Sequence, residues 1–340
     1  MKNVTLKQIA EELNISITAV SKALKDYPDV SKVTKQRVLD LAKKLKYVPN
    51  SFAVSLRVKQ SRTIGVIIPA TVHHFFSSVI QGILNEAEKK DYLVILLHSN
   101  ENFELEKKQV DLLISKGVDG ILISLSNNTK NLDHLKKIID YKIPLILFDK
   151  IAKSINCSKV IIDDKQAAYD AVRHLIHKGY KRIAHFRGDL NPQNSIDRFL
   201  GYKQALLDCN ISYDSSLVYL CNNNSDFEDG YNNAKKLLDD HGKNVDAIFA
   251  ITDVIAVGII KYFTDHNIRI PEDVGLIGFS NWFMSSITSP SLSSVEQHGY
   301  EMGEKSAGLL FYEIECKLQN IFTAPQVFVL PAKLVIRESC

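Results

Sequence analysis

The sequence predicts an α/β protein with a small all-α head at its N-terminus and a larger core that contains two doubly wound parallel sheets. Residues 1–62 hold 13 Lys and Arg against 5 Asp and Glu, whereas the remainder is slightly acidic. After residue 62, short apolar runs alternate with runs of 12–18 residues that have helical periodicity, as in parallel sheets covered by helices on both faces. Val118-Asp119-Gly120-Ile121 is echoed 127 residues later by Val245-Asp246-Ala247-Ile248, as expected for two similar lobes.

Composition excludes several classes of protein. The 340 residues are enough for two or three domains and for a core without disulfides or metal. The five cysteines are odd in number and lack a CxxC pair, which favours reduced thiols. The N-terminus has no apolar signal region, and the two uncharged stretches, 63–85 and 275–295, contain prolines and many polar residues. We therefore expect a soluble, cytoplasmic protein without a membrane partner, a metal or another cofactor.

Three short helices are predicted in the head. Thr5 and Gln8 form a capping box for the first helix, and Ser16 and Ser31 cap the second and third. The break at Asn14 separates the first two helices by a tight turn. Two such helices and a third that completes their core form a helix-turn-helix domain.

The second helix carries the residues that would read DNA, because this helix enters the major groove in such domains. Ile17 and Thr18 begin it and lie nearest to the base edges. Lys22, one turn later, can reach guanine O6 and N7. A three-helix protein-interaction module is the alternative, but the basic outer face of the head favours a polyanion.

A short segment separates the head from the core. It begins with Pro49 and holds only about two turns of good helix formers, too few for a stable isolated helix. We expect it to fold only against a partner, such as the same segment of a second subunit on DNA. The predicted domains are a helix-turn-helix head (1–48), a hinge helix and linker (49–61) and a core (62–340).

Nine buried strands are predicted in the core. They are Ile64–Ile68, Leu93–Leu97, Ile121–Leu125, Leu145–Phe148, Val160–Ile162, Ile183–Phe186, Leu217–Leu220, Ala247–Ile251 and Leu276–Phe279. A cleft between two α/β lobes, beyond the carboxyl ends of their strands, is where ligands bind.

The head resembles, in one register throughout, that of the lactose-repressor/galactose-repressor family of bacterial transcription regulators. The resemblance is carried by Val4-Thr5-Leu6-Lys7-Gln8-Ile9-Ala10, Ile15-Ser16, Ala19-Val20-Ser21-Lys22-Ala23-Leu24, Val30-Ser31, Thr34, Arg37-Val38, Tyr47-Val48-Pro49-Asn50 and Ser55-Leu56. It implies that Leu56, with Ala53 beside it, inserts into the minor groove at the centre of a palindrome and kinks the duplex. It also implies DNA contacts, mostly to phosphates, by Thr5, Ser16, Ser21, Ser31, Thr34, Tyr47 and Asn50.

The core resembles the same family nearly end to end. The main cues are Thr63–Pro69, Gly117–Ile121, Phe148-Asp149, Gly179–Ala184, Thr252-Asp253, Pro271–Val274 and Ile277–Phe279. The resemblance implies a two-lobed, periplasmic-binding-protein-like core that binds a small effector in its cleft and forms a homodimer. The first lobe is expected at about 62–161 and 292–323 and the second at about 162–291 and 324–340, with crossings near Ile162, Pro290 and Pro325.

The resemblance also implies an effector site. Phe75 would pack on a flat ligand face, Asp149 would accept hydrogen bonds from hydroxyls, and Arg198 would be the strongest donor. The other implied residues are Thr252, Asp253, Ser280, Asn281, Trp282 and Gln297. Three structural alternatives stay open: Asp253 only caps a helix, Trp282 belongs to the core, or Arg198 forms an ion pair with Asp197 or Asp149.

Several positions depart from the family pattern. Ile17 replaces a polar residue or Arg, and Lys22 replaces a frequent Arg, which bears on the operator sequence. Thr252 replaces Asn and Ser280 replaces Asp, so two strong pyranose-binding groups are missing or moved. Asn281 and Trp282 would compensate, and the ligand is then an unusual sugar, a disaccharide, a phosphorylated or acidic sugar, or a nucleoside.

We therefore predict a transcription regulator, a repressor that binds a palindromic operator as a dimer under the control of a sugar-like effector. No Walker A, HExxH or GxSxG motif is present, and no GxGxxG follows a strand, so we do not expect an enzyme. Two alternatives stay open: a regulator gated by a partner protein, and a sugar-binding enzyme with an accessory DNA-binding head.

Overall fold

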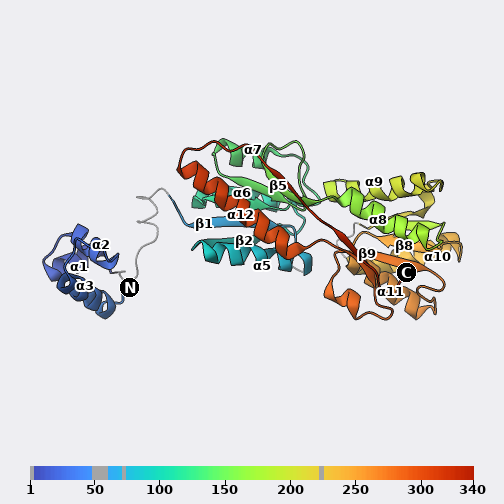
Figure 1. The fold of residues 1–340 in the computed structure, drawn as a ribbon, viewed down its shortest axis with the longest axis horizontal. Coiled ribbons are helices and arrows are strands. Elements are labelled where there is room, and N and C mark those ends of the chain that lie inside the picture. The colour runs from blue at the N-terminus through green and yellow to red at the C-terminus, as the bar shows by residue number, and fades with distance from the viewer. Residues whose placement is uncertain (1–3, 48–59, 71–73, 222–225) are drawn as a thin grey trace. The chain divides into compact units, whose positions relative to one another are not determined.

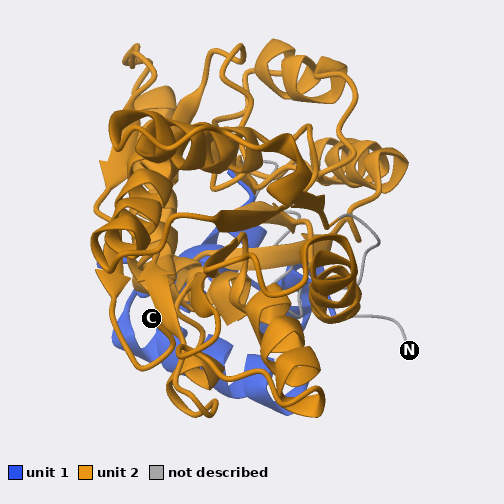
Figure 2. Ribbon diagram, turned by 90° about the vertical axis from the view of Figure 1, so that its right-hand side faces the viewer, with its two compact units in different colours: residues 1–61 blue, residues 62–340 orange. Residues whose placement is uncertain are grey.

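A computed structural model describes residues 4–47, 60–70, 74–221 and 226–340 (Figure 1). The chain divides into two compact units, Met1–Ser61 and Arg62–Cys340 (Figure 2). Within the described ranges, no helix is long and apolar enough to cross a membrane. The predicted hinge falls almost wholly outside these ranges.

The head consists of three helices around a small apolar core, so the predicted helix-turn-helix is confirmed. The helices are α1 (Leu6–Leu13), α2 (Ile17–Leu24) and α3 (Lys32–Lys44). Thr5 Oγ1 accepts a hydrogen bond from the Gln8 amide, and the Gln8 side chain accepts one from the Thr5 amide. Ile9, Val20 and Val38, one from each helix, are fully buried where the helices meet.

The first lobe of the core is a six-stranded parallel sheet in the order β11-β5-β4-β3-β1-β2. Its strands are β1 (Thr63–Ile68), β2 (Leu93–His98), β3 (Gly120–Ile123), β4 (Leu145–Phe148), β5 (Ser158–Ile162) and β11 (Val327–Leu330). Its helices are α5 (His74–Lys89), α6 (Phe103–Lys116), α7 (Asp133–Asp140) and α12 (Gly299–Leu318). Helices α5 and α12 touch backbone to backbone, because a side-chain carbon at Gly82 would lie 2.2 Å from the Tyr300 carbonyl oxygen.

The second lobe repeats this plan in the order β12-β10-β9-β8-β6-β7. All neighbours are parallel except β12, which runs antiparallel to β10. Its strands are β6 (Ile183–Arg187), β7 (Val218–Leu220), β8 (Ala247–Ala250), β9 (Gly275–Phe279), β10 (Ser293–Glu296) and β12 (Lys333–Val335). Its helices are α8 (Asp164–His177), α9 (Gln193–Asp208), α10 (Asp226–His241) and α11 (Asp253–Asp265), with short 3₁₀ turns η1 (Ser215–Leu217) and η2 (Phe283–Ser286).

The sequence echo marks equivalent corners of the two lobes. Asp119, just before β3, accepts a hydrogen bond from the Arg62 amide at 2.9 Å. Asp246, just before β8, accepts from the amides of Lys181 and Arg182 at 2.8 Å. Each aspartate therefore ties the start of one strand to the chain that enters the neighbouring strand.

Two predicted lobe boundaries are wrong. The predicted first lobe includes residues 292–296, but β10 lies in the sheet of the second lobe. The predicted second lobe includes residues 324–330, but β11 pairs with β5 in the first lobe. The last two crossings therefore fall at residues 297–298 and 331–332, later than the expected positions near Pro290 and Pro325.

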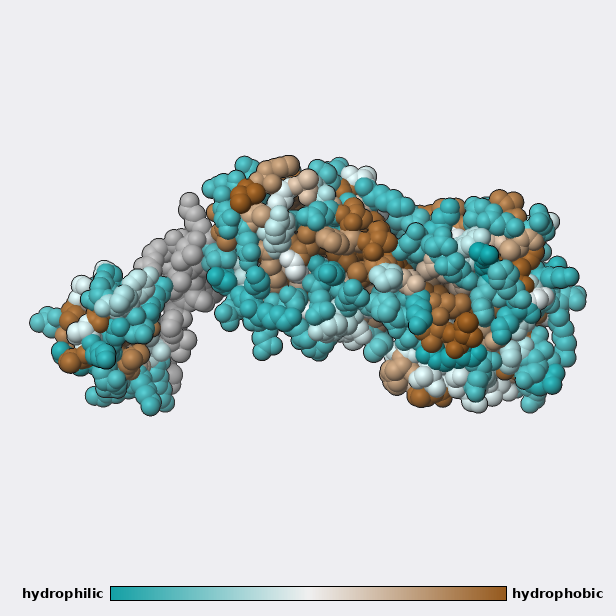
Figure 3. Space-filling view, viewed as in Figure 1, coloured by the Kyte–Doolittle hydropathy of each residue, from teal (hydrophilic) through white to brown (hydrophobic). Residues whose placement is uncertain are grey.

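The outer edge of the first sheet is apolar. On β11, Val327 and Val329 are 58% and 56% exposed, and Figure 3 shows apolar surface over this part of the core. This strand therefore leaves an edge of the sheet exposed.

Candidate DNA-binding head and interlobe site

The exposed part of α2 carries the predicted base-reading residues. Ile17 and Thr18 are exposed at the first turn of the helix, while Ser21 and Lys22 are half-buried. Val20 points into the head core. The residues that would face a major groove are therefore separated from those that hold the head together.

Lys22 has a partner that the sequence analysis missed. Its ammonium group contacts the carboxylate of Asp29, in the loop between α2 and α3. This contact lowers the pKa of Asp29 below its usual value. Lys22 must leave or share this carboxylate to reach a base.

The hydroxyls implied in phosphate binding mark the starts of helices. Ser16 Oγ accepts from the Ala19 amide at 3.0 Å, and Ser31 Oγ lies 2.9 Å from Thr34 Oγ1. A hydroxyl that accepts from an amide keeps its own proton for donation, and the start of a helix favours an anion. Tyr47 packs half-buried against the head core, and burial raises the pKa of its phenol.

Three implied DNA contacts, Asn50, Ala53 and Leu56, lie outside the described residues. The minor-groove wedge therefore stays a prediction.

Asp149 joins the two lobes of the core. It follows β4, is 7% exposed and has a φ of 55°, a left-handed conformation that is strained for a residue other than glycine. Its Oδ1 accepts from Asn194 Nδ2, on α9 of the second lobe, at 3.3 Å. Burial raises the pKa of Asp149, and the charge of Arg198 opposes this rise.

Arg198 lies on α9 one turn after Asn194 and is 4% exposed. Its Nε donates to Asp164 Oδ1 at 2.7 Å, its Nη1 donates to the Ile251 carbonyl at 3.0 Å, and its guanidinium stacks 3.6 Å from the centre of the Phe279 ring. The ion-pair alternative is thus realised with Asp164, a partner not predicted from the sequence.

Asp164 opens α8, directly after the first crossing between the lobes. Burial raises its pKa to about 6 despite the opposing charge of Arg198, and nearby Asp149 adds to the rise. Removing a carboxylate from water therefore outweighs its attraction to the single guanidinium.

Thr252, and not Asp253, caps α11. Thr252 Oγ1 accepts from the Ile255 amide at 3.3 Å and donates to Asp226 Oδ2 at 3.3 Å. The structural alternative in which Asp253 only caps this helix is therefore not realised.

Asp253 anchors the loop that follows β9. It is 1% exposed, and its Oδ2 accepts from the Trp282 amide at 2.6 Å and from Ser285 Oγ at 2.8 Å. Its Oδ1 accepts from Ser294 Oγ at 2.5 Å. A side-chain carbon at Gly278 would lie 2.2 Å from this oxygen, so only glycine fits there. Both oxygens of the Asp253 carboxylate therefore accept hydrogen bonds from other groups of the protein.

The polar residues after β9 are also engaged. Ser280, with a φ of 110°, donates through Oγ to Gln297 Oε1 at 2.8 Å. Asn281 donates to Glu296 at 2.7 Å and accepts from Arg337 at 2.6 Å. The structure thus joins Ser280 to Gln297, whereas Asn281 serves the second lobe.

Aromatic residues connect the lobes beside these groups. Trp282 is half-buried, and its ring meets Phe283 edge-on at 5.4 Å. Phe283 in turn meets His74 of α5 at 6.0 Å. Phe75 is 9% exposed and packs edge-on against Phe76 in the core of the first lobe.

Further interlobe residues were not predicted. Asn127 Nδ2, after β3, donates to Asp189 Oδ2, after β6, at 2.8 Å. Lys150 Nζ holds Glu101 Oε1 at 2.7 Å beside them, and also contacts Asn127. Both Asn127 and Asp189 come shortly after the end of a strand, and this position in the sequence is the feature from which they could have been predicted. Within the described ranges, no group of three or more His, Cys, Asp or Glu residues could hold a metal ion.

Two family models match the chain. "Bacterial regulatory proteins, lacI family" matches residues 5–50, and "Periplasmic binding proteins and sugar binding domain of LacI family" matches residues 61–337. The chain belongs to the LacI family. Catabolite control protein A of Priestia megaterium is 33% identical to this LacI-family chain over 99% of both. The ribose operon repressor of Halalkalibacterium halodurans is 31% identical over 98% of this chain and 96% of its own.

The fold is similar to that of the Lac repressor dimer bound to operator and the anti-inducer ONPF, with a TM-score of 0.85, 22% identity and 99% of each chain covered. The predicted family and the predicted fold class are confirmed. This LacI-family chain is a DNA-binding transcription regulator, like its relatives, and not an enzyme.

Proposed function

We propose that this regulator is a repressor that acts in the cytoplasm, binds a palindromic operator as a homodimer and is controlled by a sugar or sugar derivative bound between its lobes. The family match of the core to a sugar-binding domain and the name of the ribose operon repressor support the effector class. The capped helices and exposed α2 of the head support DNA binding.

The contact between Asp149 and Asn194, beside Arg198, carries this proposal. It combines a carboxylate of the first lobe with an amide and a guanidinium of the second. A polyol suits such a set, because each hydroxyl both donates and accepts a hydrogen bond. A ligand that enters this contact replaces direct contacts between the lobes, and it thereby shifts the balance between lobe arrangements.

One observation favours a second candidate, a regulator gated by a partner protein. Thr252, Asp253 and Asn281, which would line the second lobe, all hydrogen-bond within the protein. In that case the interlobe site would be silent to small ligands, and a partner protein would change DNA affinity.

Operator binding is tested by selecting duplexes from a random pool with the full chain. We expect palindromic sequences, and we expect Leu56→Ala to remove DNA bending and most of the specific affinity, because an inserted apolar side chain unstacks a base step. Fluorescence anisotropy and gel mobility measure both effects. Val33→Ala changes an exposed apolar residue of α3 and is the control. Selection of non-palindromic sites, or DNA bending by Leu56→Ala as large as that by the wild-type chain, would contradict the proposal.

The effector is sought by following Trp282, the only tryptophan. The purified protein is titrated with monosaccharides, disaccharides, sugar phosphates and nucleosides. We expect a saturable response to one class, which Asn194→Ala weakens. No response from any class, in a folded protein, would favour the partner-gated regulator.

A further inference from the structure

Arg187, a cationic residue that takes no part in the interlobe contacts described above, lies at the end of β6. The Cζ of Arg187, the last residue of β6, lies 4.1 Å from the centre of the Phe199 ring. Its Nε is buried and has no hydrogen-bond partner among the described residues. Burial lowers the pKa of this guanidinium, and Tyr213 opposes the change.

Lys203 brings a second cation to the same ring. Its Nζ lies 5.6 Å from the centre of Phe199 and 4.9 Å from that of Tyr213. The two cationic groups are therefore no more than about 10 Å apart. In the described part of the chain, neither forms a salt bridge within 4.0 Å. Aromatic faces attract cations, but they do not neutralise two like charges, so this place is suited to an anion.

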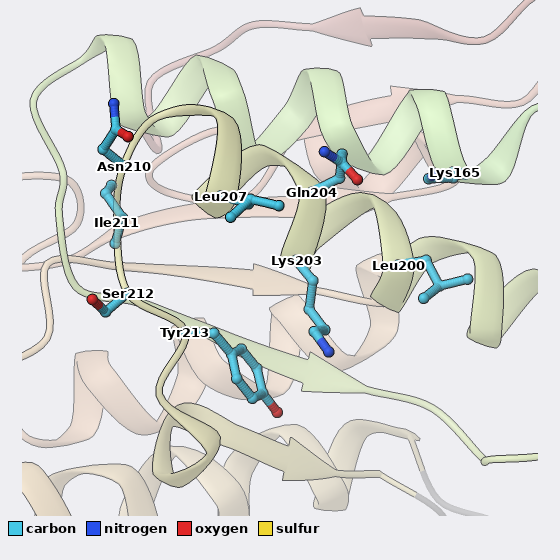
Figure 4. Close-up of a pocket in the computed structure, with 9 residues that line it drawn as sticks. All are labelled: Lys165, Leu200, Lys203, Gln204, Leu207, Asn210, Ile211, Ser212 and Tyr213. Carbon is cyan, nitrogen blue, oxygen red and sulfur yellow. The ribbon is translucent and has the colours of Figure 1, made fainter.

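A groove lined by Lys203, but not by Arg187, runs along the outer face of α9. Lys203 and Tyr213 line a cavity of about 490 Å³, and they lie beside each other on one side of the helix in Figure 4. Leu200 and Leu207, which are 43% and 68% exposed, add apolar surface to the same cavity. Cavities of this size hold small organic ligands.

The charge around the groove gives it a direction. The neighbouring hollow, toward α8, is lined by Asp163 and Asp208 and shares Lys165 with the groove. The charged residues that line the groove itself are Lys165 and Lys203. An anionic group is therefore favoured in the groove, most of all at Lys203, which does not line the acidic hollow. The exposed leucines offer burial to the apolar part of the same ligand.

We propose that this groove is a second small-molecule site, separate from the interlobe site, that binds an amphiphilic anion: a phosphate or carboxylate attached to an apolar body. The anionic head lies beside Lys203, with the charge of Arg187 within about 10 Å of that ammonium group, and the body covers Leu200 and Leu207. Helix α9 then serves two sites, because its opposite face carries Asn194 and Arg198.

Hexyl phosphate is the probe, followed by ³¹P NMR titration of the full chain. Inorganic phosphate represents the head alone, and hexanol, which represents the body alone, is measured as a competitor that displaces hexyl phosphate. We expect saturable binding of hexyl phosphate that is at least about tenfold tighter than that of either fragment, because both contacts act together. We expect Lys203→Gln to weaken binding at least about fivefold, the size of one charge-assisted contact. Lys235→Gln changes an exposed lysine of α10; it is the matched control, and we expect it to leave binding unchanged.

Arg187→Gln provides a second variant, with circular dichroism to verify the fold. Absence of saturable binding by the wild-type chain would overturn the site. The site would also be overturned if Lys203→Gln and Arg187→Gln both bound hexyl phosphate as tightly as the wild-type chain. Binding of hexanol or inorganic phosphate as tight as that of hexyl phosphate would overturn it too.

Discussion

At the scale of single residues, Lys22 is held by Asp29 before it meets DNA. We expect Asp29→Asn to strengthen operator binding about two- to fivefold at low salt, because an exposed ion pair is weak and a carboxylate near phosphates is repelled. Anisotropy titrations at two salt concentrations measure this gain, which shrinks as salt rises. Asp40→Asn, which changes an exposed aspartate of α3, is the control.

Lys22→Ala should do the opposite, costing about 1–3 kcal/mol and relaxing specificity at one base position. If Lys22→Ala weakens binding while Asp29→Asn leaves it unchanged, Asp29 does not restrain Lys22 in solution.

Asp164 makes the stability of the folded chain depend on pH. Its pKa is raised to about 6 in the folded chain, whereas an unfolded aspartate titrates near 3.9. The unfolded form therefore loses its proton first, and this group's contribution to stability falls as the pH rises between these two values. We expect the stability of the wild-type chain relative to Asp164→Asn to fall from about pH 4 to about pH 6, as measured by urea unfolding. A constant or growing difference would show that the pKa is not raised.

The residues of this site were unequally predictable. Asp149 follows a recognisable strand, and Asn194 lies one helical turn before Arg198, so a search for polar residues on the same helix face would have found it. Asp164 follows Asp163, which caps α8. Only the packing of α8 against α9 decides which of two adjacent carboxylates turns inward to Arg198.

At the scale of elements, Asp253 ties α11 to β10 and to the loop after β9. We expect Asp253→Asn to lower the free energy of unfolding by roughly 1.5–3 kcal/mol or more, because an amide cannot accept all of these hydrogen bonds and introduces donors. Urea unfolding measures the loss, and Trp282 fluorescence reports the loop. Asp265→Asn, at the other end of α11, removes an exposed i,i+4 pair and should lower the free energy of unfolding much less than Asp253→Asn does. Similar losses in the two variants would contradict the anchoring role.

The nine predicted strands were all found, since each is an apolar run bounded by turn residues. The strands β10, β11 and β12 were not predicted. They are only three or four residues long, and β10 and β12 mix polar with apolar residues. Their sheet membership cannot be read from their periodicity, because it depends on where the chain crosses between lobes. The aspartate echo, in contrast, correctly indicated two equivalent lobes. Asp119 and Asp246 each accept a hydrogen bond from a backbone amide at the start of the neighbouring strand.

At the scale of the whole core, the hydrogen bond between Asn127 and Asp189 stabilises this arrangement of the lobes. Removing it with Asp189→Ala should destabilise the arrangement by about 0.5–1.5 kcal/mol. If the effector binds this arrangement, its affinity should fall about two- to tenfold although Asn194 and Arg198 are intact. Trp282 titrations measure the change, and Asp170→Ala, which removes a hydrogen bond within α8 alone, is the control.

The same variant tests whether the lobes transmit the signal to DNA. By linkage, the factor by which effector changes operator affinity equals the factor by which operator changes effector affinity. Both factors should change together in Asp189→Ala, because both depend on the same equilibrium between lobe arrangements. An altered effector affinity with an unchanged coupling factor would mean that this hydrogen bond lies outside the conformational change, and that the signal passes through other contacts, such as Phe283 with His74.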